Sequence, residues 1–110
     1  MEFPNREKAY IPISKLRDYL LSETHLVGKA KARFWRAVGF DKTNMDVLRQ
    51  SLIDIARHGE VREVTTSPYG TKYMVEGSIQ TPLGKAVRVR TVWIIDRGQD
   101  RPRFVTAYPV

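Results

Sequence analysis

From residue 61 onward, apolar and polar residues alternate with a period of two, which is the strongest constraint on what this chain can fold into. Four segments rich in β-branched and aromatic residues follow one another, at 61–65, 72–79, 87–96 and 104–108. Short spacers containing proline or glycine separate them, at 67–70, 81–84 and 97–102. Because spacers of this length suit hairpins, the sequence predicts a four-stranded antiparallel meander.

The residues before position 61 have the period of amphipathic helices instead. Three helices are expected: 15–21 after a cap at Ser14, 28–39, and 45–58 after a cap at Asn44. The sequence therefore predicts a single α+β domain over 1–110, with a helical part at about 12–59 and a sheet part at about 61–109. Its three N-terminal helices are expected to pack on one face of the sheet, leaving the other face partly open.

Composition excludes several classes of enzyme. The chain has no cysteine and two histidines, so it lacks a disulfide framework, a thiol nucleophile and a clustered zinc site. Phosphate-binding and dinucleotide-binding glycine motifs are absent, and no paired carboxylates stand out. We therefore expect no metal and no cofactor. With no apolar leader or membrane-length apolar run in the sequence, the expected location is the cytoplasm, with no membrane partner.

The net charge of +7 is large for 110 residues and predicts a surface that attracts polyanions. Within residues 24–40 the basic residues have no acidic neighbour; they are Lys29, Lys31, Arg33 and Arg36. A nucleic-acid ligand or substrate is the favoured interpretation. The alternative is a soluble protein that is basic for no specific purpose.

One candidate site lies at the start of the expected second helix. His25 precedes Gly28 and Lys29, and the free backbone N–H groups of a helix N-terminus favour anions. His25 and Lys29 could therefore converge on one phosphate, with the imidazole transferring a proton. The alternative is an ordinary loop histidine followed by a basic helix face. His58, at an expected helix end, has less functional weight.

The expected strands hold further candidates. Arginine and lysine side chains there can contact phosphate, namely Lys72, Arg88 and Arg90, and so can Arg103 in the turn before the last strand. The alternative is that exposed strand positions carry arginine for solubility alone. Trp93 and Tyr108 could stack on unpaired bases, although core packing is the commoner role of such a tryptophan. On the last strand, one face is expected to hold Phe104, Thr106 and Tyr108. Thr106 and Tyr108 could form a wall of the site, or these residues could serve only the fold.

Two stretches, THLVGKAKARFWRAVGF and GTKYMVEGSIQTPLGKAVRVRTVWIIDRGQDRPRFVTAYP, resemble a family of small bacterial domains of unknown function. Such domains occur alone or at the C-termini of polymorphic and contact-dependent toxins. The resemblance covers about residues 11–109, and it implies site roles for His25, Lys29, Arg90, Thr106 and Tyr108. More distantly, the architecture is similar to the barnase, EndoU, colicin and RelE-like nuclease superfamily, whose members usually cleave RNA without metal.

These observations lead to three hypotheses. The first is a toxin-type, metal-independent endoribonuclease that acts on RNA such as tRNA or mRNA by attack of the ribose 2′-OH, and that an acidic antitoxin or immunity protein neutralises. The second is a non-catalytic nucleic-acid-binding module, in which Lys31, Arg33, Lys72, Arg88, Trp93 and Arg103 contact the ligand. The third is a protein-interaction domain of the immunity or antitoxin kind.

Overall fold

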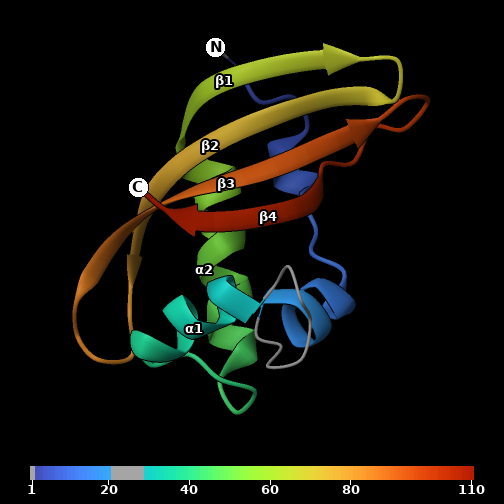
Figure 1. The fold of residues 1–110 in the computed structure, drawn as a ribbon. Coiled ribbons are helices and arrows are strands. Elements are labelled where there is room, and N and C mark those ends of the chain that lie inside the picture. The colour runs from blue at the N-terminus through green and yellow to red at the C-terminus, as the bar shows by residue number, and fades with distance from the viewer. Residues whose placement is uncertain (1, 21–28) are drawn as a thin grey trace.

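The structure is a computed structural model that describes residues 2–20 and 29–110 (Figure 1). In these residues, the helical elements are η1 (Arg6–Lys8), η2 (Lys15–Leu20), α1 (Lys29–Ala37) and α2 (Met45–His58). The strands that follow are β1 (Glu60–Ser67), β2 (Gly70–Gln80), β3 (Ala86–Asp96) and β4 (Arg103–Pro109). The predicted α+β class is confirmed.

The four strands form one antiparallel sheet in the order β1-β2-β3-β4, which confirms the predicted meander. The hairpin between β2 and β3 is tightly closed, since Thr81 donates both its backbone N–H and its hydroxyl to the carbonyl oxygen of Lys85, at 2.9 and 2.7 Å. Gly84 has a φ of 85° in this turn, a conformation that glycine adopts without strain. From this turn the register of β2 and β3 continues without a break.

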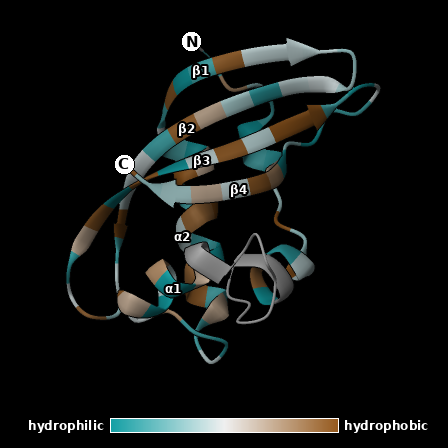
Figure 2. Ribbon diagram, viewed as in Figure 1, coloured by the Kyte–Doolittle hydropathy of each residue, from teal (hydrophilic) through white to brown (hydrophobic). Residues whose placement is uncertain are grey.

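Helix α2 covers one face of the sheet, and its apolar side faces the strands (Figures 1 and 2). Two glycines permit this close approach. A Cβ atom on Gly59 would lie 2.6 Å from the carbonyl oxygen of Glu76, and one on Gly77 would lie 2.9 Å from Cγ1 of Ile55. The core between helix and sheet contains fully buried large side chains, among them Leu48, Leu52, Val75, Val89, Trp93 and Phe104.

The other helical elements are arranged differently from the prediction. The sequence predicted three helices on one sheet face, whereas α1 packs against η2, and η2 in turn contacts β4 (Figure 1). Trp35 of α1 is fully buried beside Phe40, with ring centroids 6.0 Å apart. Asn44 precedes α2 as expected, but its side chain bonds backward, to Gly39 and Asp41, and does not cap the helix.

The N-terminal segment, for which the sequence predicted no element, is part of the core. Its apolar side chains are buried at Phe3, Ala9 and Ile11. Tyr10 pairs with the start of β4, where its N–H donates to Pro102 and its carbonyl accepts from Phe104, both at 3.0 Å. Arg6 donates to the carbonyls of Ala56 and Gly59 at the end of α2, at 2.8 and 2.7 Å. A cation there satisfies free carbonyls and complements the helix dipole.

Candidate functional site on the uncovered sheet face

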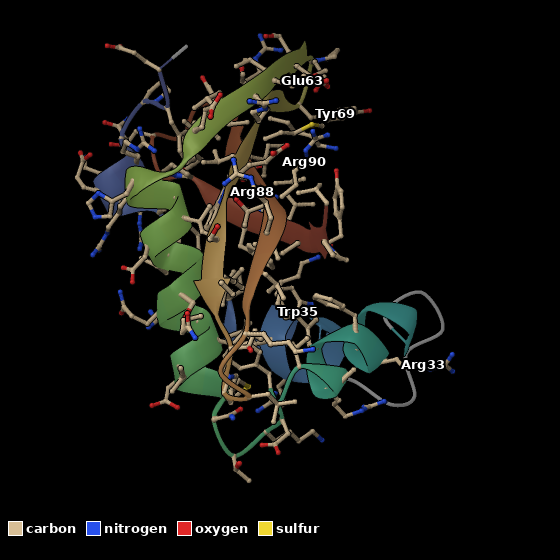
Figure 3. All side chains as sticks on the ribbon, turned by 90° about the vertical axis from the view of Figure 1, so that its left-hand side faces the viewer. Arg33, Trp35, Glu63, Tyr69, Arg88 and Arg90 are labelled. Carbon is tan, nitrogen blue, oxygen red and sulfur yellow. The ribbon has the colours of Figure 1, made fainter. Side chains whose placement is uncertain are left out.

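The two sheet faces differ in character. Helix α2 lies on one side, and Arg90 extends from the opposite side (Figure 3). Strand register determines which residues share that opposite face, here called the uncovered face. Among them are Arg62, Glu63 and Thr65 of β1, Lys72, Met74 and Glu76 of β2, Arg88, Arg90, Val92 and Ile94 of β3, and Arg103, Thr106 and Tyr108 of β4. Most of the sequence-predicted strand residues are therefore brought together.

Glu76 is at the centre of this face, directly opposite Arg90 in the adjacent strand. Only 7% of Glu76 is exposed. Arg90 holds its carboxylate with two donors, Nε at 2.8 Å and Nη2 at 2.6 Å, both to Oε2. Because a buried carboxylate is stable only when it is paired, this contact explains how Glu76 is retained in the sheet.

Two further arginines approach the same carboxylate. Nε of Arg62 lies 3.8 Å from Oε2 of Glu76, and Nη2 of Arg88 lies 3.9 Å from Oε1. Both side chains are nearly half exposed, so they keep N–H donors available to an external group. We call Arg62, Arg88 and Arg90 with Glu76 the arginine cluster. Through these donors the cluster can hold a phosphate or a carboxylate.

A β-bulge brings Arg62 into the cluster. The register of β1 and β2 shifts between Val61 and Glu63, which makes Arg62 the extra residue. Bulges commonly redirect a side chain in this way. Glu60 also binds Arg62, at 2.6 Å from Oε1 to Nη1, so it orients the guanidinium from the strand's first position.

Tyr108 completes the cluster from β4, where it pairs with Arg90. The pKa of the Arg90 guanidinium is raised, chiefly by its hydrogen bonds to Glu76 and then by the hydrogen bond to the Tyr108 side chain. Arg90 is therefore a permanent cation that joins a carboxylate on one side to a phenol on the other.

The last strand departs from the predicted alternation. The sequence predicted that Phe104, Thr106 and Tyr108 would share one face, but the register shifts between Val92 and Trp93. Phe104 is therefore opposite Trp93 in the core, while Thr106 and Tyr108 face the uncovered side. The bulge allows the chain end to close the core and line the site at once.

Trp93 is unable to serve as the predicted stacking platform. It is completely buried, and its ring packs edge-on against Phe104 at 5.3 Å. Its indole Nε1 donates to the Thr91 hydroxyl at 2.7 Å, which in turn donates to the carbonyl of Val75 at 2.7 Å. With every polar atom of the pair satisfied inside the core, neither ring face is open to a base.

The other predicted residues are dispersed. Arg103 lies at the far end of the uncovered face, where Nε and Nη2 each bind Asp96 at 3.1 Å. Arg33 is exposed on α1, away from the sheet (Figure 3). His25 lies outside the described residues, as do the side chains of Lys29 and Lys31. His58 is exposed at the end of α2, on the covered side of the sheet.

Sequence reasoning missed Glu76 and Arg62. Counting outward equally from the predicted spacer at 81–84 would pair Glu76 with Val89. The hairpin instead closes over 81–85, and this one additional residue places Glu76 opposite Arg90. Only that pairing identifies the lone carboxylate of the strand as part of a buried ion pair. Arg62 had no signal either, since a bulge determines its direction.

Within residues 2–20 and 29–110, no three histidine or acidic side chains gather closely enough to hold a metal ion. None of the helices in this described part is long and apolar enough to cross a membrane.

The fold and the site define a small α+β domain with a basic cluster on an uncovered sheet face. The chain belongs to the family described as a domain of unknown function, DUF6883, which matches residues 2–110. No curated protein matches the chain. Among solved structures, it resembles a contact-dependent growth inhibition toxin and immunity protein complex from Klebsiella pneumoniae 342. The matching chain gives a TM-score of 0.74 at 19% identity, covering 94% of this chain and 95% of that chain, and thus the same fold.

Proposed function

We propose that this protein is a toxin-type, metal-independent endoribonuclease whose active site is the arginine cluster. The observation that carries the proposal is a recessed carboxylate, Glu76, with three arginines around it on a sheet face that α2 does not cover. Cleavage of RNA without metal needs a base for the 2′-OH, cations for the phosphorane and an acid for the leaving oxygen. The cluster and Tyr108 supply one group of each kind.

In the proposed reaction, Glu76 takes the proton of a ribose 2′-OH as O2′ forms a bond to phosphorus. Arg62, Arg88 and Arg90 stabilise the charge on the phosphoryl oxygens. The bond from phosphorus to O5′ then breaks, and the Tyr108 hydroxyl donates its proton to O5′. The products are a 2′,3′-cyclic phosphate and a 5′-hydroxyl end. Roles for His25 and Lys29 in the same reaction stay a sequence-based prediction.

The structural neighbour supports the biological setting. It is a complex of a toxin with an immunity protein, so the shared fold is compatible with either role. The net charge of +7 favours the toxin, because a polyanionic substrate is attracted to a basic surface. The proposed substrate is cytoplasmic RNA, such as tRNA or mRNA, and the proposed inhibitor is an acidic immunity or antitoxin protein. The resemblance to the barnase-like superfamily is also part of this proposal.

A second candidate function is RNA binding without cleavage. It is favoured by the two short contacts from Arg90 to Oε2 of Glu76, which occupy the carboxylate that a base would need. In this alternative Glu76 only orients the arginines. The protein would then bind RNA through the same cluster and leave it intact.

The proposal is tested by incubating the purified protein with RNA in EDTA and analysing the fragment ends. We expect Glu76→Gln to lower the cleavage rate by about 10²–10⁴-fold, the usual effect of losing a general base. Glu63→Gln is the matched control, since Glu63 is an exposed carboxylate on the same face, and it should leave the rate unchanged. Substrate with a 2′-O-methyl group at the cleaved nucleotide should resist.

Loss of all activity in EDTA, or equal cleavage of DNA, would contradict the mechanism. Full activity of Glu76→Gln would show that Glu76 is not the general base. If the wild-type protein binds RNA without cutting it, the second candidate function is correct.

A further inference from the structure

Apolar side chains extend from the arginine cluster along the uncovered face. Val92 and Ile94 follow Arg90 on the same side of β3, and Figure 2 shows the hydrophobic colouring of this end of the strand. They are only 6% and 7% exposed, although they face away from α2. A strand that is apolar on both sides is typical of burial on both sides. Neighbouring side chains of this face therefore already cover Val92 and Ile94, and the accessible surface here belongs to their partly exposed neighbours.

The cross-strand neighbours of Val92 are Met74 in β2 and Thr106 in β4. The three form a row across the sheet, immediately next to the row of Glu76, Arg90 and Tyr108. Both Met74 and Thr106 are partly exposed, so the row retains some accessible surface. We call Met74, Val92 and Thr106 the apolar row.

Thr106 has a polar atom that the fold does not use. Its Oγ1 is buried and has no hydrogen-bond partner within the described residues. A buried hydroxyl without a partner lowers stability, and valine would fill the same volume at a β-strand position without that penalty. A hydroxyl can both donate and accept, which suits it to the edge of a nucleobase.

We propose that the apolar row is a nucleobase subsite for single-stranded RNA, in which the Thr106 side chain turns its buried hydroxyl outward to read the base of a nucleotide whose phosphate lies at the arginine cluster. The inference rests on the proposed function and adds a substrate class to it. Rows two residues apart along a strand are separated by about 6–7 Å, which is comparable with the distance from a phosphate to the base of the adjoining nucleoside. Met74 would pack against the base, because a thioether contacts aromatic rings favourably.

Single-stranded RNA fits this arrangement better than a duplex. In a duplex the bases are stacked and their pairing edges are occupied, whereas an unpaired base can turn toward the protein. Glu76 is also recessed, at 7% exposure between the strands that hold the arginines. A flexible backbone can bring its 2′-OH to such a group more readily than a rigid helix can.

The test compares Thr106→Val with the wild-type protein on single-stranded RNA oligonucleotides that differ only in the base at the cleaved nucleotide. We expect the wild type to prefer one base, and Thr106→Val to reduce that preference about tenfold or more in kcat/KM. Its thermal unfolding midpoint should be unchanged or higher, because an unsatisfied hydroxyl is removed. Thr65→Val changes an exposed threonine on the same face and should retain the preference.

Binding is measured in parallel, by fluorescence anisotropy of the same oligonucleotides with the Glu76→Gln protein, so that the subsite is tested even if no cleavage occurs. Loss of base discrimination in both assays with Thr106→Val supports the subsite. Unchanged discrimination in an otherwise active enzyme overturns the subsite and leaves the proposed catalysis intact. Equal affinity for single-stranded and duplex RNA, or for all four bases, also overturns the subsite. A protein partner would then be the better candidate to bind the apolar row. Cleavage that Glu76→Gln does not alter counts against the catalytic proposal alone.

Discussion

The ion pair between Asp96 and Arg103 contributes a stability that depends on pH. The pKa of the Asp96 carboxyl is lowered, mainly by its hydrogen bonds from Arg103. A carboxyl with a lowered pKa in the folded state stabilises the fold above its ordinary pKa of about 3.9, and this stabilisation is lost as the pH falls through the lower folded value. At neutral pH the contribution is therefore fully present.

We expect Asp96→Asn to reduce the free energy of unfolding by about 0.5–1 kcal/mol at pH 7, a small effect because both side chains are about one-third exposed. The difference from wild type should shrink as the pH falls below about 3.9, because the Asp96 carboxyl is then progressively protonated. Urea unfolding at pH 7 and at a series of acidic pH values measures it, and a double-mutant cycle with Arg103→Gln isolates the pair. A difference that stays constant across the acidic range would show that the substitution acts through packing.

Individual residues of the candidate site were predicted from their type and from the family resemblance. Arg90 and Tyr108 were predicted in this way, and the structure places them opposite each other in adjacent strands, with a hydrogen bond between their side chains. Glu76 was missed because a single acidic residue in a strand resembles ordinary surface charge until its pairing with Arg90 is known. Trp93 was assigned to the ligand because alternation alone does not reveal which face of a strand is buried.

At the level of elements, the end of α2 is fitted closely to the strand that carries Glu76. A Cβ on Gly59 would meet carbonyl oxygens of Glu76 and Ile55, each at 2.6 Å, with φ at an ordinary −75°. We expect Gly59→Ala to lower the free energy of unfolding by about 3 kcal/mol through overpacking against backbone. Cleavage should fall as well, because relief of the clash displaces Glu76.

Gly84→Ala is the matched control for this prediction. Gly84 has a φ of 85°, and no atom lies within 4 Å of the position that an added Cβ would take, so its substitution introduces backbone strain alone, of about 1 kcal/mol. Urea denaturation of the two variants compares these costs. If Gly59→Ala were as stable as Gly84→Ala, the helix end would have room to move and the fit would be looser than its geometry indicates.

The strands were predictable to within a few residues because β-branched residues, alternation and turn residues agree along this part of the chain. The two bulges were not, since nothing in the local composition at Arg62 or before Thr106 distinguishes an extra residue from a regular one. The element against which α1 packs could not be predicted either. Its apolar residues indicate that one side is buried, but they do not say whether the partner is the sheet or η2.

For the molecule as a whole, the net charge of +7 predicts binding to polyanions, and the structure raises the question of which cations are responsible. Each phosphate contact by lysine or arginine releases condensed counterions, so affinity declines as salt rises, with a slope of about −0.7 per contact on single strands. If the whole basic surface attracts RNA, many lysines and arginines each contribute a little to this salt dependence. If a defined site binds RNA, a few residues account for most of it.

We expect the double variant Arg62→Gln and Arg88→Gln to reduce the magnitude of the salt slope for single-stranded RNA by about 1.4, corresponding to two lost contacts. The control is Lys42→Gln with Arg49→Gln, which removes the same charge from exposed positions beside and on α2, away from the arginine cluster. Titrations by fluorescence anisotropy at several salt concentrations measure both slopes. Equal reductions in the two double variants would mean that RNA is held by the general field of a basic protein. A reduction confined to the cluster variant would locate the phosphate contacts on the uncovered face, independently of whether the bound RNA is cut.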